Sequence, residues 1–242
     1  AVTAGKLLVA DLDPREALRQ GRLASAPADT PLPPRWTILE LAIENARLAG
    51  HGRRDRARLA AGAVHAMQLD EQAHTRLGAA EPAVKHAALL AAALATDAPT
   101  LVVEDFTPGL PDAAARTLAR AFVTAAKGRQ WVLFAGRLAL SSPLGLEAEE
   151  AVLFSGGRFA CAGLPAEIAT RERTYSVRTS GEKALAFADS LRERGAAVEA
   201  DESGRALTVT IPDGFSTLDL VALARTSDVV VLELQPLSGA VA

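Results

Sequence analysis

The sequence predicts an α/β domain with a largely parallel sheet, followed by a smaller α+β domain. Residues 101–103 and 131–135 are short apolar runs typical of buried strands, and helical stretches lie around and between them. Strands that alternate with helices form parallel sheets. After residue 172 the expected element order becomes β-α-β-β-α-β, the ferredoxin-like arrangement. We therefore expect domains at residues 1–172 and 173–242.

Composition excludes several classes of protein. The chain of 242 residues has a net charge of −3, which argues against a nucleic-acid partner. Cys161 is the single cysteine, so an internal disulfide is impossible and a cytosolic setting fits. The longest run of low charge, residues 87–96, is too short to span a bilayer.

Local signals predict the elements of the first domain. Four prolines make residues 25–35 a loop, and Thr37 with Glu40 forms a capping box that opens a helix to residue 49. Asp112 is expected to cap a helix that ends before Gly128. The other expected elements are a strand at 6–10, helices at 56–67 and 81–95, and a hairpin of strands 151–154 and 158–162.

The second domain shows clearer periodicity. Alternation at residues 206–211 puts Leu207, Val209 and Ile211 on one face of a strand, and Ser216 is placed to cap a helix. The expected order is strand 174–178, helix 181–194, strand 197–200, turn 201–204, strand 206–211, helix 216–225 and strand 229–234.

Residues 100–112, with the sequence TLVVEDFTPGLPD, resemble the Walker B strand and D-loop of an ATP-binding cassette (ABC) ATPase. The family pattern is a hydrophobic strand ending in Asp-Glu-Pro-Thr, followed by Ser-Gly-Leu-Asp. Here the acidic pair is Glu104-Asp105, Phe106 replaces the proline, and residues 108–111 read Pro-Gly-Leu-Pro. The resemblance implies a nucleotide-driven motor whose working residues are altered.

The resemblance covers residues 4–170 and depends on the order and spacing of several segments. It implies a partial P-loop NTPase core with a helical subdomain at about residues 37–96. The corresponding segments are a strand at 4–9, the Q-loop exit at 36–40, the signature helix at 81–94 and the family's usual ending at 148–168. Residues 173–235 resemble the small C-terminal domain of ATPases from ABC-2-type exporters.

The nucleotide-binding Walker A loop is not recognisable. Its glycine N–H groups and lysine normally hold the phosphates, and the sequence contains no Gly-x-x-x-x-Gly-Lys-Ser/Thr. Gly5-Lys6 is at best a decayed copy, because Leu7 replaces the hydroxyl that binds Mg²⁺. We expect the P-loop strand and helix to lie upstream of Ala1, outside this chain.

The Walker B carboxylates have exchanged their residue types. By the resemblance Glu104 would bind Mg²⁺ and Asp105 would be the catalytic base, but Glu104 is one methylene too long and Asp105 one too short. The alternative interpretation, which we favour, is a strand-end pair satisfied by N–H groups of nearby loops.

Other nucleotide-contacting positions are altered too. The switch histidine falls on Gly136, beside Arg137, and the Q-loop glutamine falls near Ala28 or Asp29, of which only Asp29 could bind a cation. The signature motif is replaced by Glu81, Pro82 and Ala83. A carboxylate repels a triphosphate and proline lacks an N–H, whereas both residues suit a structural helix start, which is the interpretation we favour.

Other candidate groups are interpreted as structural. We find no metal-binding spacing among the histidines; His65 is expected to pack against apolar neighbours and His86 to be solvated with Lys85. Residues 155–157, Ser-Gly-Gly, are a hairpin turn rather than a phosphate nest. The basic cluster at residues 53–58 fits either a partner contact or a solvated helix face.

These observations favour a degenerate, non-hydrolysing ABC nucleotide-binding subunit with a structural or regulatory role. The resemblance implies a peripheral position on the cytoplasmic side of an ABC-2-type membrane transporter or envelope complex, as a homodimer or as a heterodimer with another ABC ATPase. No cofactor is expected, except ATP and Mg²⁺ if the missing P-loop exists. The alternatives are an active exporter ATPase whose P-loop lies upstream, and a soluble binding or dimerisation module.

Overall fold

The computed structural model describes residues 6–139, 141–155, 158–169, 173–180, 183–203 and 205–237. The chain divides into two compact units, residues 1–136 and 137–242, and each is described by itself. The domain boundary expected at residues 172 and 173 falls inside the second unit, next to residues outside the described part, and it stays a prediction.

Within the described residues the first unit contains a parallel sheet of three strands, and the parallel arrangement was expected. The strands are β1 (Leu23–Ala26), β2 (Thr100–Glu104) and β3 (Gln130–Phe134), and β2 lies in the middle. The register places Leu101 beside Ala24 on one side and beside Trp131 on the other. Because all three strands run in the same direction, the loops that follow them leave the same edge of the sheet.

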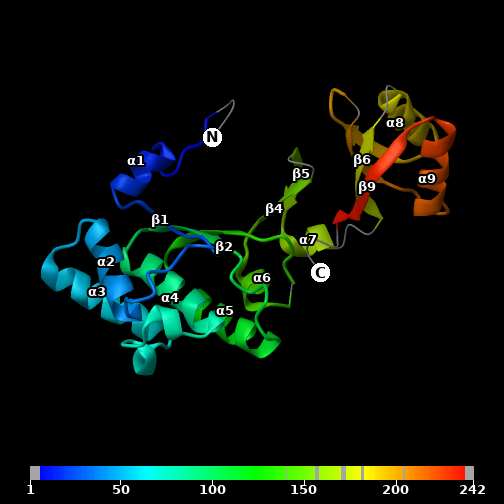
Figure 1. Ribbon diagram of the computed structural model, residues 1–242. Coiled ribbons are helices and arrows are strands. Elements are labelled where there is room, and N and C mark those ends of the chain that lie inside the picture. The colour runs from blue at the N-terminus through cyan, green and yellow to red at the C-terminus, as the bar shows by residue number, and fades with distance from the viewer. Residues whose placement is uncertain are drawn as a thin grey trace. The chain divides into compact units, whose positions relative to one another are not determined.

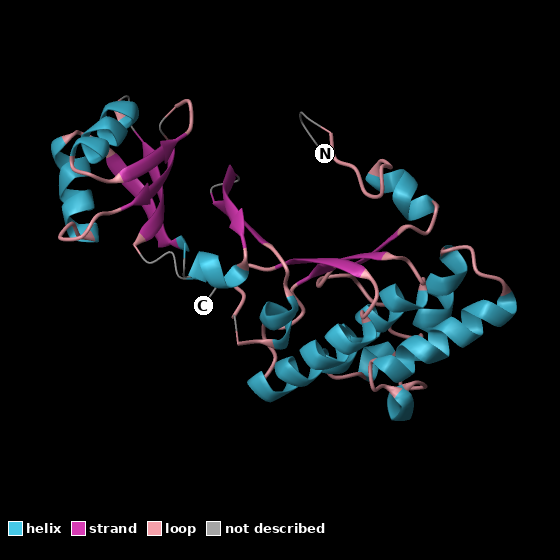
Figure 2. Cartoon of the chain, turned by 180° about the vertical axis from the view of Figure 1, so that it is seen from behind, coloured by secondary structure: helices cyan, strands magenta, loops and turns pink. Residues whose placement is uncertain are grey.

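Helices of this unit cover one side of the sheet (Figures 1 and 2). They are α2 (Ile38–Leu48), α3 (Arg53–Ala66), α4 (Pro82–Ala95) and α5 (Asp112–Ala125), with short 3₁₀ turns at Asp70–Gln72 and Leu77–Ala79. The short helix α1 (Pro14–Arg19) lies apart from them, above the sheet in both views. Leu101 and Val103 of β2 are buried, and Phe122 of α5 contacts Trp131 of β3 edge to face at 5.7 Å. Apolar burial on this side therefore joins α5 to the sheet.

β3 corrects one prediction, because it is not a buried strand. Exposure alternates along it, and Val132 and Phe134 are 50% and 58% exposed. In the described residues β3 lies at one edge of the sheet, and these two side chains alternate with Trp131 and Leu133. An apolar run of five residues does not reveal whether one or both of its faces are covered.

The start of the chain also differs from the prediction. No strand forms at residues 6–10 within the described part; Val9 and Leu12 make an isolated bridge around Ala10 and Asp11, both of which have positive φ. The strand of this region is β1, whose residues Leu23, Ala24 and Ala26 are buried, so the loop expected from residue 25 starts two residues later. The sequence did not reveal β1, because its small side chains do not form a recognisable apolar run.

Helix boundaries follow local capping chemistry. The predicted capping box is confirmed: the Glu40 N–H donates to Thr37 Oγ1 at 3.2 Å, and the Thr37 N–H donates to Glu40 Oε2 at 2.8 Å. The prediction that Asp112 caps α5 is wrong, because the extended backbone of Pro111 occupies the cap and Asp112 is the first helical residue. α3 begins at Arg53, three residues earlier than expected, directly after Gly52.

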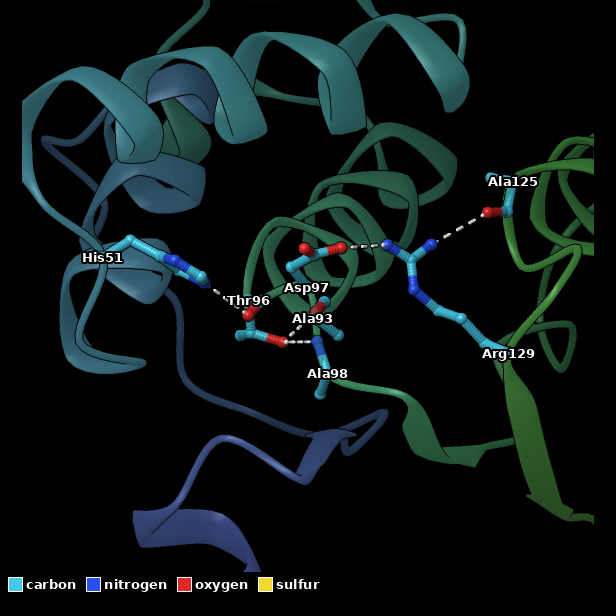
Figure 3. A network of polar contacts seen from close by, with 7 residues as sticks. All are labelled: His51, Ala93, Thr96, Asp97, Ala98, Ala125 and Arg129. Atoms are coloured by element: carbon cyan, nitrogen blue, oxygen red, sulfur yellow. Dashed lines mark hydrogen bonds and ion pairs between the residues drawn. The ribbon is translucent and has the colours of Figure 1, made fainter.

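A polar network fastens the end of α4 to its neighbours (Figure 3). His51 Nε2 donates to the Thr96 carbonyl at 2.8 Å, and Thr96 Oγ1 accepts from the Ala98 N–H at 3.3 Å. Arg129 donates to Asp97 Oδ1 at 3.0 Å and also bonds the last turn of α5. These bonds join three segments at one point: the loop before α3, the turn before β2 and the start of β3.

The second unit begins with a short helix, α6 (Pro143–Glu147), and an antiparallel hairpin. The hairpin strands are β4 (Ala151–Ser155) and β5 (Arg158–Gly163), as predicted, and α7 (Pro165–Ala169) follows them. Gly156 and Gly157 lie outside the described residues, so the choice between a turn and a phosphate nest stays open. Cys161 of β5 is buried.

The rest of the second unit has the predicted element order. The elements are β6 (Thr174–Ser180), α8 (Ala184–Glu193), β7 (Ala197–Ala200), β8 (Ala206–Thr210), α9 (Thr217–Thr226) and β9 (Val230–Pro236). The four strands are antiparallel in the spatial order β7-β8-β6-β9. Leu207, Val209 and Ile211 are buried, as expected, in a core with Phe187 and Leu220. Across the described residues no helix is both long and apolar enough to cross a membrane.

Candidate functional site

The altered nucleotide-site positions of the first unit come from loops at one edge of its sheet. Ala28 and Asp29 follow β1, Glu104 ends β2, Asp105 comes next, and Gly136 follows β3. The carboxyl edge of a parallel sheet is where α/β proteins bind their ligands. The structure therefore gathers the predicted Walker B, Q-loop and switch positions at the edge where a ligand site is expected.

Glu104 is held by the loop that follows β1. Its Oε2 accepts a hydrogen bond of 2.9 Å from the Ala28 N–H, across 76 residues of sequence. The side chain of Asp29 is exposed, and within the described part of the chain it makes no hydrogen bond. The Q-loop region thus meets the Walker B strand through a backbone donor rather than through a side-chain ligand.

Asp105 is turned back onto its own loop. Its Oδ1 accepts from the Thr107 N–H at 2.9 Å and from the Thr107 hydroxyl at 2.7 Å. Its own N–H donates to the Phe134 carbonyl at 2.8 Å, which continues the pairing of β2 with β3 beyond the strand end. Aspartate commonly makes such local bonds at turns. Loop donors thus engage one oxygen of each carboxylate, in the direction of our favoured interpretation, and a catalytic or metal-binding role for either stays a prediction.

Phe106 anchors this loop in the hydrophobic core, a feature that the sequence did not reveal. Its side chain is 3% exposed and contacts the Phe122 ring edge to face, with 5.6 Å between centroids. Its carbonyl accepts a hydrogen bond of 2.7 Å from His86 Nδ1, since a carbonyl can only accept. The expectation that His86 is solvated is therefore wrong: this half-buried side chain of α4 joins the helix to the loop.

The start of α4 has the structural character that we favoured. Glu81 is the N-cap residue but makes no side-chain capping bond, and Pro82 occupies the first turn, where a missing N–H costs nothing. Glu81 and Pro82 are exposed and Ala83 is half-buried. No hydroxyl and no glycine N–H are present at these three positions to contact a phosphate.

Gly136 has room for a side chain but has none. A Cβ built there would meet no atom within 4 Å, and its backbone does not require glycine. Gly136 is the last residue of the first unit, and the exposed Arg137 is the first residue of the second. Because each unit is described by itself, Arg137 is not assigned to this site. The switch position therefore offers no group that can polarise a phosphate.

The residues of this edge fit a magnesium ion poorly. Mg²⁺ is usually bound through one or two carboxylates together with substrate phosphates and water. Glu104 and Asp105 would supply the carboxylates, but loop donors already engage one oxygen of each. Across the described residues there is no group of three or more His, Cys, Asp or Glu side chains that could hold a metal.

His65 corrects another expectation. Its side chain is 79% exposed rather than packed, and its Nδ1 lies 3.0 Å from Asp70 Oδ2. An open depression of about 490 Å³ lies beside this pair. Its lining does not include Glu104, Asp105 or any other residue of the sheet edge.

Solved structures share this fold. An inward-facing transporter described as of the metal-chelate ABC type matches at a TM-score of 0.53 and 12% identity, over 81% of this chain and 74% of that one. An ATP-binding subunit of an ABC transporter matches at 0.54 and 15%, over 66% and 67%. A nucleotide-free ATP-binding cassette matches at 0.52 and 16%, over 64% and 65%. No family model and no curated protein matches the sequence. The chain has an ABC ATPase-like fold.

Proposed function

We propose that this chain is a degenerate ABC nucleotide-binding subunit that does not hydrolyse ATP. The observation that carries the proposal is the engagement of both Walker B carboxylates by loop donors, Glu104 by Ala28 and Asp105 by Thr107. The ABC ATPase-like fold supports the same assignment. In this proposal the fold of the ATPase is kept, while loop donors engage one oxygen of each carboxylate that would take part in hydrolysis.

The hydrogen bonds of Asp105 oppose a role as general base. Both bonds fall on Oδ1 and fix the direction of the carboxylate, so a water molecule that lies away from Oδ2 could be reached only if the carboxylate left both donors of Thr107. A hydrogen bond to a charged group contributes about 1.5–3 kcal/mol, and each 1.36 kcal/mol in a barrier changes a rate about tenfold. Release of both bonds would slow hydrolysis by about 100-fold or more.

The signature position, which in an ABC ATPase contacts the nucleotide of the partner subunit, is also altered in a way that opposes hydrolysis. A partner's triphosphate would meet Glu81 where the family supplies a hydroxyl, and Pro82 where it supplies an N–H. Like charges in contact repel. We therefore assign the chain a structural or regulatory role, paired with itself or with an active ATPase.

We further propose that the subunit belongs to the ABC-2 exporter type, on the cytoplasmic side of a membrane transporter or envelope complex. The elements from β6 to β9 follow the order β-α-β-β-α-β, and their sheet order is that of a ferredoxin-like domain. Such a domain at this place in the chain supports the ABC-2 assignment.

An active exporter ATPase, with its P-loop ahead of residue 1, is the second candidate. Glu104 and Asp105 keep their charges, and Val132 and Phe134 of a parallel sheet are exposed. Parallel sheets are normally covered on both faces, so these apolar side chains favour a further layer of structure. A mass of the natural protein well above 25.2 kDa, with a Walker A motif in the added sequence, would favour this candidate.

Steady-state hydrolysis tests the first proposal. The natural full-length protein is incubated with MgATP, and phosphate release is compared between the wild type and Asp105→Asn. We expect the same background rate for both. A wild-type rate that the substitution abolishes would refute the non-hydrolysing assignment and support the second candidate.

A further inference from the structure

The turn between α2 and α3 concentrates positive charge in an acidic chain. We define the α2–α3 corner as residues 47–58, RLAGHGRRDRAR, which hold five arginines and one aspartate. With histidine neutral its formal charge is +4, while the whole chain carries −3. The remainder of the chain is therefore clearly acidic, and this corner is a local exception.

Most of this charge is not neutralised within the protein. Arg53 and Arg54 are exposed, and no carboxylate of the described residues lies within ion-pair distance of either. Arg58 lies 3.8 Å from Asp55, but its side chain is 69% exposed, and such exposed pairs contribute little. Arg47 pairs with Glu44 and still keeps 49% of its side chain exposed.

Helix stability does not account for these arginines. Arg53 and Arg54 lie in the first turn of α3, where the helix dipole disfavours positive charge. Asp55 is the acidic residue of this turn, but it stands against two arginines, and Gly52 at the cap has no side chain to add to it. A cluster that disfavours its own helix indicates a role in contact with something negatively charged.

An apolar side chain lies beside this charge. Leu48, the last residue of α2, is 69% exposed. The turn is held in one shape by the His51 N–H bond to the Ala46 carbonyl and by His51 Nε2 on Thr96 (Figure 3). A membrane surface has phosphates in its headgroup layer and acyl chains beneath. Arginines can contact the phosphates, and an exposed leucine near them can enter the boundary with the acyl chains.

We propose that the α2–α3 corner binds the surface of an anionic phospholipid membrane. Arg53, Arg54 and Arg58 contact lipid phosphates, and Leu48 enters the boundary between headgroups and acyl chains. The contact orients the first unit on the membrane by itself. It requires neither nucleotide nor a membrane-protein partner, so its test is separate from that of the proposed function.

Vesicle sedimentation of the full chain tests this proposal. The vesicles are phosphatidylcholine alone, or phosphatidylcholine mixed with phosphatidylglycerol. We expect binding only to the anionic vesicles, and weaker binding as salt rises. Removal of the three exposed arginines by Arg53→Gln, Arg54→Gln and Arg58→Gln is expected to weaken binding about 100-fold. Leu48→Ser is expected to weaken it about tenfold without changing the salt dependence.

A matched control distinguishes binding through the α2–α3 corner from a general attraction of arginines to the anionic membrane. Arg76, Arg116 and Arg120 are exposed arginines elsewhere on the first unit, and their joint change to Gln removes the same three charges. This control should bind as the wild type does. No binding to anionic vesicles, or equal losses in the two triple variants, would overturn the proposal. Circular dichroism confirms that each variant is folded.

Discussion

Phe106→Ala is the substitution that most directly probes how the altered Walker B loop is built. Phe106 is 3% exposed and makes an edge-to-face contact with Phe122, so almost its whole side chain is removed from water. Truncation of a buried phenylalanine costs about 3–5 kcal/mol, of which the aromatic pair accounts for about 0.5–1.5 kcal/mol. We expect the first unit to lose about 3–5 kcal/mol of unfolding free energy, measured by urea denaturation followed by tryptophan fluorescence, since both tryptophans, Trp36 and Trp131, lie in this unit.

Phe134→Ala is the matched control for this measurement. It removes the same atoms from a side chain that is 58% exposed and lies on the next strand. We expect a loss of less than about 1 kcal/mol, because most of this ring already contacts solvent. A loss below about 1 kcal/mol for Phe106→Ala, or equal losses for the two variants, would refute the conclusion that Phe106 anchors the loop.

Three further substitutions test other contacts. His51→Ala should destabilise the first unit by about 1–3 kcal/mol, because the half-buried Thr96 carbonyl loses its side-chain donor; unchanged amide exchange at the end of α4 would contradict this. Ser216→Ala should raise the pKa of Asp219, because the side-chain hydrogen bond from Ser216 is the main cause that holds this pKa below its usual value; carboxyl NMR titration measures the pKa. Because the folded-state pKa is lowered, this contribution to stability is present at neutral pH and lost as the pH falls through that pKa, so the variant should be less sensitive to acid than the wild type. Arg47→Gln should raise the pKa of Glu44, which is lowered mainly by the Arg47 hydrogen bond, without a measurable change in the denaturation midpoint, since the pair is exposed.

Most predictions that depended on local chemistry were confirmed; the exception is Asp112, because Pro111 takes the cap of α5. Thr37 and Ser216 each open a helix through a reciprocal capping box, and all its participants lie within four residues of sequence. The alternation of Leu207, Val209 and Ile211 also identified a buried face correctly. Such signals are visible in sequence because the partner of each group lies in the same short segment.

Features that depend on tertiary contacts were not predictable. The partner of Glu104 is a backbone N–H 76 residues away, and the partner of His86 is the carbonyl of Phe106. No side-chain pattern encodes either contact. The residues at 6–10 are apolar enough for a strand, but β1 forms at Leu23–Ala26, where small side chains fit beside β2. Pairing with β2 depends on residues far along the chain, which a local pattern does not show.

Single-turnover hydrolysis tests the central claim most directly. The natural full-length protein, in excess over radiolabelled MgATP, is sampled for released phosphate, and Asp105→Asn and Thr107→Ala are measured in parallel. The account predicts no release above the background of buffer for any of the three proteins, because the Asp105 carboxylate is engaged by its loop and Gly136 supplies no side chain. Phosphate release by the wild type that Asp105→Asn abolishes would contradict it.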